Sequence, residues 1–180
     1  MNREIEAKIK VPALAPTEIL LTERGAKFMH TVHQVDTYFM DTHKLLHKKD
    51  CGLRIRQQVI NHDTSAIITF KGARQEGKYK ARPEYETGID NVEMMQRIFE
   101  SLGFYKRLTV EKQRTMWQLG PCEVCLDELV ELGTFVEVEG PDDAAVESVL
   151  AELNLHNEPH IEDSYAAMLD RALKLETLDE

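Results

Sequence analysis

Charged and apolar side chains alternate along the first strand-like segment of the chain. In residues 2–11, NREIEAKIKV, the charged residues Glu4, Glu6 and Lys8 are separated by Ile5 and Ala7. Because successive side chains of a β-strand point to opposite faces, a strand here has one charged face and one apolar face. A surface strand has this pattern, and so does the wall of a charged cavity. A cavity wall requires distant strands to repeat the alternation, and a single surface strand does not.

The two-residue period recurs along the chain and predicts eight strands, at 3–10, 34–40, 52–60, 65–71, 80–87, 106–118, 122–130 and 134–140. Segments with helical periodicity lie between and after them, at 16–25, 90–103, 141–154 and 163–176. This order predicts an α+β fold with an antiparallel-rich sheet, curved or closed, and helices packed on its outside. With no linker, internal repeat or low-complexity tract, the 180 residues predict a single domain, 1–180.

Short polar and glycine signals mark the ends of these helices. Asp90 with Glu93 three residues later has the spacing of a capping box, and Asp142 favours a helix start. Gly25 and Gly103 are expected to end the helices that precede them.

Composition excludes several functional classes. A net charge of -10 argues against nonspecific binding to nucleic acid or to anionic membranes, which favour basic surfaces. No apolar run approaches the roughly 20 residues of a membrane-spanning helix, and the first residues lack the apolar centre of a signal peptide. We therefore expect a cytoplasmic location. The oligomeric state stays open, a homodimer included.

The charges on the alternating face sort into pairs of like sign. Its seven acids are Glu4, Glu6, Glu84, Glu86, Asp127, Glu137 and Glu139, and its seven bases are Lys8, Arg54, Arg56, Lys71, Arg82, Lys112 and Arg114. The net charge of this face is zero, whereas that of the whole chain is -10. The face is therefore selectively rich in bases. A solvated sheet face with cross-strand ion pairs is one interpretation. The other is a cavity for a metal-bound polyphosphate, because paired carboxylates suit Mg²⁺ and paired bases suit phosphate oxygens.

Several short motifs occur together and in order along the chain. They are EIEAK (4–8), QVDTYF (34–39), LRIR (53–56), TFKG (69–72), RPEYE (82–86), EKQR (111–114), LDELVELGTFVEVE (126–139) and SY (164–165). In this combination the chain resembles the CYTH superfamily of triphosphate tunnel enzymes, and VEKQRTMW with LDELVELGTFVEVE is most similar to its class IV adenylyl cyclases. The resemblance implies a closed, eight-stranded antiparallel β-barrel that binds a triphosphate with a divalent metal, Mg²⁺ or Mn²⁺, in its lumen.

Carried over by position, the resemblance also implies roles for the residues of the charged face. Glu4, Glu6, Glu137 and Glu139 match metal-binding acids. The phosphate-binding bases are matched by Lys8, Arg54, Arg56, Lys71, Arg82, Lys112 and Arg114. Asp127 matches an acid near the reacting end, and with Lys8 and Lys112 it forms the expected catalytic group. Glu84 and Glu86 share the face without an assigned role.

Three functions remain open at this stage. An adenylyl cyclase would convert ATP to 3′,5′-cyclic AMP and pyrophosphate, by attack of the ribose 3′-hydroxyl on the α-phosphorus. A triphosphatase would use the same residues to hydrolyse inorganic, nucleoside or thiamine triphosphate, the difference being the substrate pose. A noncatalytic polyphosphate-binding module is disfavoured, because carboxylates repel an anion unless a metal is present.

Other motifs carry less weight. Cys122 and Cys125 form a CxxC, but on a strand this spacing puts the two thiols on opposite faces, and no second CxxC or flanking His completes a zinc site. Residues 72–79, GARQEGKY, nearly match a P-loop but end in Tyr and lead into a strand pattern. His43 and His47 lie where we expect a turn.

Overall fold

The computed structural model describes residues 3–75 and 79–173; the side chains of Arg3, Glu4 and Lys80 lie outside the described part. Within it the strands are β1 (Arg3–Val11), β2 (Lys27–Asp41), β3 (Gly52–Ile60), β4 (Asp63–Lys71), β5 (Lys80–Gly88), β6 (Phe104–Leu119), β7 (Cys122–Leu129) and β8 (Gly133–Gly140). The helices are α1 (Ala15–Glu23), α2 (Leu45–Lys48), α3 (Val92–Ser101), α4 (Asp143–Glu152) and α5 (Tyr165–Ala172). The α+β class and the eight antiparallel strands are confirmed.

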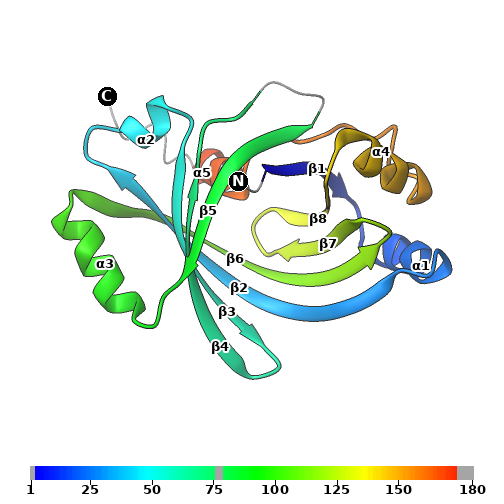
Figure 1. Ribbon diagram of the computed structural model, residues 1–180, viewed down its shortest axis with the longest axis horizontal. Coiled ribbons are helices and arrows are strands. Elements are labelled where there is room, and N and C mark those ends of the chain that lie inside the picture. The colour runs from blue at the N-terminus through cyan, green and yellow to red at the C-terminus, as the bar shows by residue number, and fades with distance from the viewer. Residues whose placement is uncertain (1–2, 76–78, 174–180) are drawn as a thin grey trace.

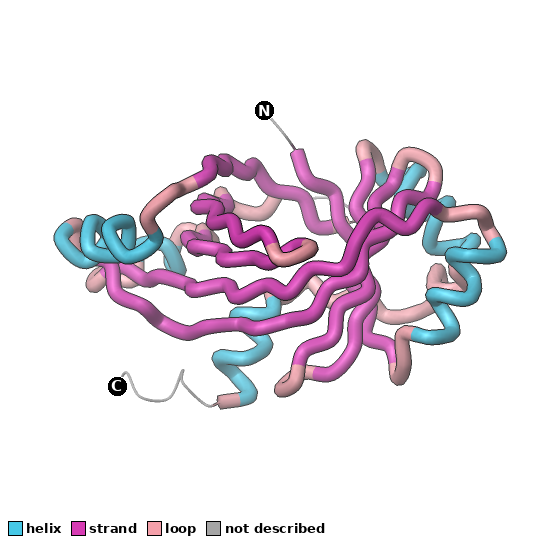
Figure 2. Tube along the Cα trace, turned by 90° about the horizontal axis from the view of Figure 1, so that it is seen from below, coloured by secondary structure: helices cyan, strands magenta, loops and turns pink. Residues whose placement is uncertain are grey.

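The strands pair in the order β1-β5-β4-β3-β2-β6-β7-β8, and β1 pairs with β8 as well as with β5. The ring of pairings is uneven. β2 and β6 pair from Lys27 opposite Gln118 to Asp41 opposite Phe104, whereas β1 meets β5 only from Arg3 to Glu6. Figure 1 shows β2 and β6 as long, curved neighbours, and Figure 2 shows the same sheet from below with helices at both of its ends. The closed, eight-stranded barrel that the resemblance implies therefore stays a prediction.

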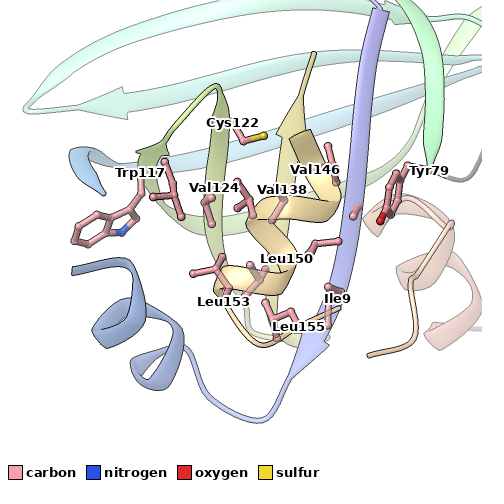
Figure 3. Close-up of a cluster of buried hydrophobic side chains, with 14 of the residues drawn as sticks. Ile9, Tyr79, Trp117, Cys122, Val124, Val138, Val146, Leu150, Leu153 and Leu155 are labelled. Carbon is pink, nitrogen blue, oxygen red and sulfur yellow. The ribbon is translucent and has the colours of Figure 1, made fainter. Parts of the chain in front are cut away.

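The apolar face of β1, β7 and β8 packs under α4. Ile9, Val124 and Val138 belong, together with Val146 and Leu150 of α4, to one cluster of buried apolar side chains (Figure 3). Gly140 lets β8 approach this helix, since a Cβ atom there would lie 2.7 Å from Cys122 Sγ and 3.0 Å from Val146 Cγ2. Alternate side chains of these strands point into this core. Their charged side chains therefore point to the opposite face of the sheet.

Two smaller clusters hold helices α3 and α5. Phe39 and Ile55 pack against Phe99 of α3. Tyr165 and Leu169 of α5 pack on Phe135 of β8 and on Leu108 and Val110 of β6. Since Phe135 alternates with Val136, which belongs to the α4 core, α5 lies against the opposite, charged side of the sheet.

The helix signals mostly agree with the structure. Asp142 accepts a hydrogen bond from Ala145 N at the start of α4, and positive φ angles of 73° and 87° at Gly25 and Gly103 follow α1 and α3. The N-cap of α3 is Asn91, which accepts from Met94 N at 2.8 Å, so the prediction of Asp90 was wrong by one residue. Both side chains are good caps, and the sequence alone does not choose between them.

Three further differences concern element bounds. β2 begins at Lys27 and not at residue 34, and its pairing with β6 shifts register between Phe28 and His30. β6 begins at Phe104, two residues before the predicted start. The turn expected around His43 contains α2, which is four residues long and too short for a periodic signal. Among the described helices, none is both long and apolar enough to cross a membrane.

Candidate active site

One cavity of about 1370 Å³ collects the charged face of the sheet. All seven predicted bases line it: Lys8, Arg54, Arg56, Lys71, Arg82, Lys112 and Arg114. Five predicted acids line it too: Glu6, Glu84, Glu86, Glu137 and Glu139. The side chain of Glu4 lies outside the described part, and Asp127 lies behind the cavity wall. Because Lys8 and Lys112 are only 3% and 4% exposed, a solvated outer sheet face is wrong for this surface.

The cavity is rich in bases relative to the chain. Of the described residues, the lining includes ten of the chain's 22 Lys and Arg and eleven of its 32 Asp and Glu. Bases are therefore concentrated here, although the lining as a whole is close to neutral.

The acids of β1 and β8 lie side by side because of the strand register. Glu6 is directly opposite Glu139, and Lys8 is opposite Glu137. Glu123 of β7 pairs with Glu139 on its other side and also lines the cavity, a residue that the sequence interpretation missed. Side chains directly opposite on neighbouring strands lie within about 5.5 Å at Cβ. The register thus puts three carboxylates from three strands in one row.

Asp127 is fully buried and organises the bases of β6. Its carboxylate accepts hydrogen bonds from Arg114 Nε at 2.7 Å, Arg114 Nη2 at 2.6 Å, Lys112 Nζ at 3.1 Å and the Tyr165 hydroxyl at 2.8 Å. Burial favours the neutral acid, but the Arg114 and Lys112 charges outweigh it and hold the pKa of Asp127 below its usual value. Asp127 is therefore an ionised anchor for two predicted phosphate-binding bases.

The ammonium groups of Lys8 and Lys112 share the ring of Tyr165. Their Nζ atoms lie 4.3 Å and 4.9 Å from its centroid. Lys8 also lies 3.2 Å from Glu137 Oε1 and donates to the Asp163 carbonyl at 3.0 Å. Tyr165 entered the sequence interpretation only through the SY motif. In the structure it contacts all three predicted catalytic residues, Lys8, Lys112 and Asp127.

The two lysines have opposite pKa shifts. Burial, followed by the nearby Arg114 charge, lowers the pKa of Lys112 to about 8. Burial works in the same direction at Lys8, but the Glu137 and Glu6 carboxylates outweigh it and raise the pKa of Lys8 above 10.5. Glu137 also forms an ion pair with Arg114. Cross-strand bases thus offset part of the like-charge repulsion that the sequence pattern predicts.

A second buried carboxylate, Asp36 of β2, holds the bases of β3. It accepts from Arg56 Nε at 2.7 Å and Nη2 at 2.8 Å, and from Arg54 Nη1 at 3.3 Å. These two charges outweigh burial and keep the pKa of Asp36 well below its usual range. Sequence reasoning missed Asp36, although it lies in the QVDTYF motif with the two-residue spacing from Gln34 and Tyr38 that marks a shared strand face.

The acids without an assigned role, Glu84 and Glu86, contact bases on the β4–β5 side. Glu84 forms an ion pair with Lys71. Glu86 lies 3.7 Å from Arg54 Nη2 and accepts from Thr69 Oγ1 at 2.6 Å. Their contacts are those of groups that position bases.

The acidic side chains that line the cavity are of the type that binds a divalent cation. Carboxylate oxygens are the ligands that Mg²⁺ and Mn²⁺ take, and the Glu6–Glu139 register supplies two on one wall. Among the side chains that the structure describes, no three His, Cys, Asp or Glu are close enough together to hold a metal. Glu4, which is two residues before Glu6 on β1, is outside that set. Glu6 and Glu139 are the nearest pair for a hard cation.

The CxxC pair lies within strand β7. Cys122 is in the outer core, whereas Cys125 faces the other way, where burial raises its pKa to about 12. This arrangement confirms the prediction that the two thiols occupy opposite faces. The described residues that follow the P-loop-like stretch form strand β5, as the alternating pattern there predicted.

Together, the fold and the cavity define a class of protein in which an antiparallel sheet presents rows of Lys, Arg and Glu to one interior site. Comparisons with known proteins place the chain within that class. The CYTH domain family model matches residues 2–167, and the chain belongs to the CYTH family.

Individual relatives agree with this assignment. The chain is 31% identical over 136 residues to a Methanocaldococcus jannaschii protein with the provisional name adenylate cyclase MJ0240, covering 76% of this chain and 75% of that protein. The solved structure of the PH1819 protein from Pyrococcus horikoshii OT3 has a TM-score of 0.83 and 26% identity, covering 93% of this chain and 98% of that one. The HpAC1 protein from Hippeastrum, whose structure is described as revealing a dominant triphosphatase activity, has a TM-score of 0.68 and 15% identity, with coverage of 95% and 96%.

Proposed function

We propose that this chain is a metal-dependent enzyme that binds a triphosphate in the cavity and converts ATP to 3′,5′-cyclic AMP and pyrophosphate. The observation that carries the proposal is the convergence of seven bases from β1, β3, β4, β5 and β6 on one cavity. Buried Arg54 Nε and Arg82 Nε have no hydrogen-bond partner among the described residues. Unpaired buried donors call for acceptors, and phosphate oxygens are acceptors of the right charge.

The proposed binding site is the lumen of a closed barrel. The ring of strand pairings supports this arrangement, and so does the position of α5 on the charged side of the sheet. Residues Asp163 to Ala167, Asp170 and Arg171 line the cavity, so α5 and its preceding turn contribute to one part of the wall. A triphosphate chain would run between the bases of β3 and those of β6.

A divalent metal, Mg²⁺ or Mn²⁺, would be held by Glu6 and Glu139 together with Glu4 and Glu137. When bound, it would supply Lewis-acid polarisation of phosphate oxygens and lower the pKa of a hydroxyl nucleophile. The near-neutral lining supports a metal requirement. With ten bases and eleven acids, the lining alone has no net positive charge to offset an anion with three phosphates.

The protein's own residues would bind and orient the phosphates. Lys112 and Arg114, fixed by Asp127, would neutralise charge that develops on the pyrophosphate leaving group, and Lys8 would do so from β1. Asp127 has a lowered pKa and accepts four hydrogen bonds, which makes it a poor proton acceptor. We therefore propose that Asp127 positions Lys112 and Arg114 and does not act as a general base.

A second candidate is a triphosphatase, in which water attacks the terminal phosphorus. The specific observation in its favour is the activity named for the Hippeastrum HpAC1 structure, which shares the fold of this chain. The cyclase has the support of the named Methanocaldococcus relative. The cavity volume also exceeds the roughly 300–1,000 Å³ of typical small-molecule sites. That volume leaves room for a nucleoside as well as a triphosphate.

Product analysis tests the proposal. The purified protein is incubated with Mg²⁺ or Mn²⁺ and either ATP or tripolyphosphate, and the products are identified by chromatography. Cyclic AMP with pyrophosphate supports the cyclase, orthophosphate supports the triphosphatase, and binding without turnover supports a noncatalytic module. Glu137→Gln should abolish turnover, while Glu128→Gln, an exposed acid on neighbouring β7, should not change it.

A further inference from the structure

We infer that Gln34 of β2, paired with Gln58 of β3, recognises the nucleoside part of the substrate through the Gln34 side-chain oxygen. The inference rests on the proposed function, because it assumes that the triphosphate occupies the same cavity. It goes further in naming which part of the wall distinguishes a nucleotide from a bare triphosphate.

The strand register puts the two glutamines beside the phosphate-binding bases. Gln34 is directly opposite Lys112 of β6 on one side and Gln58 on the other, and both glutamines line the cavity. Gln34 Nε2 donates to Gln58 Oε1 at 3.2 Å, and Gln58 Nε2 donates to Ser65 Oγ at 3.3 Å. These hydrogen bonds fix the Gln34 amide with its nitrogen toward β3.

The remaining atom of this amide has no partner. Gln34 is only 3% exposed, and its Oε1 is buried without a hydrogen bond from any described residue. A buried acceptor left unpaired is costly, and native proteins rarely retain one without a reason. Since Gln34 lines the cavity, the missing donor can come from a ligand there.

The chemistry of the missing donor excludes the triphosphate itself. The oxygens of an ionised phosphate chain are acceptors, so they cannot satisfy Gln34 Oε1. A nucleoside offers two kinds of donor, the amino group of a base and the hydroxyls of ribose. The cavity lining also includes the apolar side chains of Ile60, two residues after Gln58 on β3, and of Met116, opposite His30 of β2, against which a base or a sugar can pack.

Charged groups lie on both sides of Gln34 along the strands, and Lys112 is directly opposite it. One register step along β2 brings Asp36 with its two arginines, and one step the other way brings Val32 opposite Arg114. A triphosphate bound among these bases would therefore lie close to Gln34, and a nucleoside joined to it would be within reach of the Gln34 amide.

The test compares Gln34→Leu with Gln57→Leu, in which an exposed glutamine of the same strand as Gln58 is changed. Affinities are taken from ligand-induced shifts in the unfolding midpoint, with Mg²⁺ present, for ATP, ITP, 2′,3′-dideoxy-ATP and tripolyphosphate. Gln34→Leu should weaken ATP binding about tenfold and leave tripolyphosphate binding unchanged, and Gln57→Leu should change neither.

The two modified nucleotides identify the donor. ITP lacks the amino group of adenine, and 2′,3′-dideoxy-ATP lacks both ribose hydroxyls. One of these nucleotides should bind wild type more weakly than ATP does, and this difference should disappear in Gln34→Leu. The group that this nucleotide lacks is then the group that Gln34 binds.

Two results would overturn the inference. One is an equal effect of Gln34→Leu on ATP and tripolyphosphate, and the other is no effect on either. If the variant does not fold, equal affinity of wild type for ATP, ITP and 2′,3′-dideoxy-ATP overturns it as well. Failure of wild type to bind tripolyphosphate is a separate result, because it contradicts the proposed function and not the role of Gln34 alone.

Discussion

Asp127 and Arg114 are joined by two parallel hydrogen bonds, from Nε to Oδ1 at 2.7 Å and from Nη2 to Oδ2 at 2.6 Å. The two residues are directly opposite on β7 and β6. Arg114 lines the cavity, and Asp127 lies behind it with no exposed surface. Arg114 can therefore contact a ligand in the cavity, and Asp127 holds Arg114 in place.

Replacing Asp127 should cost stability as well as activity. Asp127→Asn removes the negative charge that offsets Arg114 and Lys112, and leaves two buried cations. Breaking a buried ion pair in this way costs about 3–5 kcal/mol of unfolding free energy. Urea unfolding at pH 7 measures the loss, with Glu128→Gln on the same strand as the control. A loss below about 1 kcal/mol would contradict the anchoring role.

Lys112 should make ligand binding depend on pH. Its pKa of about 8 means that the cation is half lost at that pH, so tripolyphosphate affinity should fall as the pH rises above about 8. Lys112→Arg keeps the charge and should remove this decline. Calorimetric titrations at pH 7, 8 and 9 make the comparison. The same decline in both proteins would show that another group is responsible.

The same group should act on stability with the opposite sign. The pKa of Lys112 is about 8 in the folded protein and 10.5 in the unfolded chain, so the unfolded state binds the extra proton between these values. The cost of burying the charged lysine is therefore present below pH 8 and is relieved between pH 8 and 10.5. Urea unfolding of wild type and Lys112→Met across this range should show a rise in stability that only wild type has. A rise of equal size in both would assign it elsewhere.

The sequence predicted which face each side chain occupies but not how deep it lies. Alternation put Arg114 and Asp127 on the same side of the sheet, as it did Lys8 and Glu137. It could not separate Arg114, at the cavity surface, from Asp127 behind it. That difference depends on Tyr165, whose hydroxyl reaches Asp127 from a helix 38 residues further along the chain.

Asp36 shows a second limit of the pattern. The interpretation looked for pairs of like charge, and Asp36 lies between Gln34 and Tyr38, so no such pair marked it. Its importance comes from Arg54 and Arg56 on the next strand, and only the β2–β3 register brings them together. Cross-strand partners are set by register, which periodicity within one strand does not contain.

Asp36 should stabilise the protein at neutral pH and stop doing so in acid. Its pKa is lowered in the folded protein, so its contribution is present above the unfolded value of about 3.9 and is lost as the pH falls through and below it. Asp36→Asn should therefore be less stable than wild type at pH 7 and lose less stability between pH 5 and pH 2.5. Urea unfolding at these pH values measures the difference, with exposed Asp63→Asn as the control. An Asp36→Asn protein with the pH dependence of wild type would contradict the assignment.

The row formed by Glu6 and Glu139 should set the metal requirement. Glu6→Gln keeps the size of the side chain and removes one anionic oxygen ligand, so the Mg²⁺ concentration for half-maximal turnover should rise at least about tenfold. The bases are untouched, and one repelling charge is gone. Tripolyphosphate binding in EDTA should therefore be as tight as in wild type or tighter. Mg²⁺ titrations of initial rate, with Glu128→Gln as the control, make the measurement. Weaker binding in EDTA with an unchanged Mg²⁺ requirement would mean that Glu6 positions Lys8 and does not bind metal, because the Glu6 carboxylate also raises the pKa of Lys8.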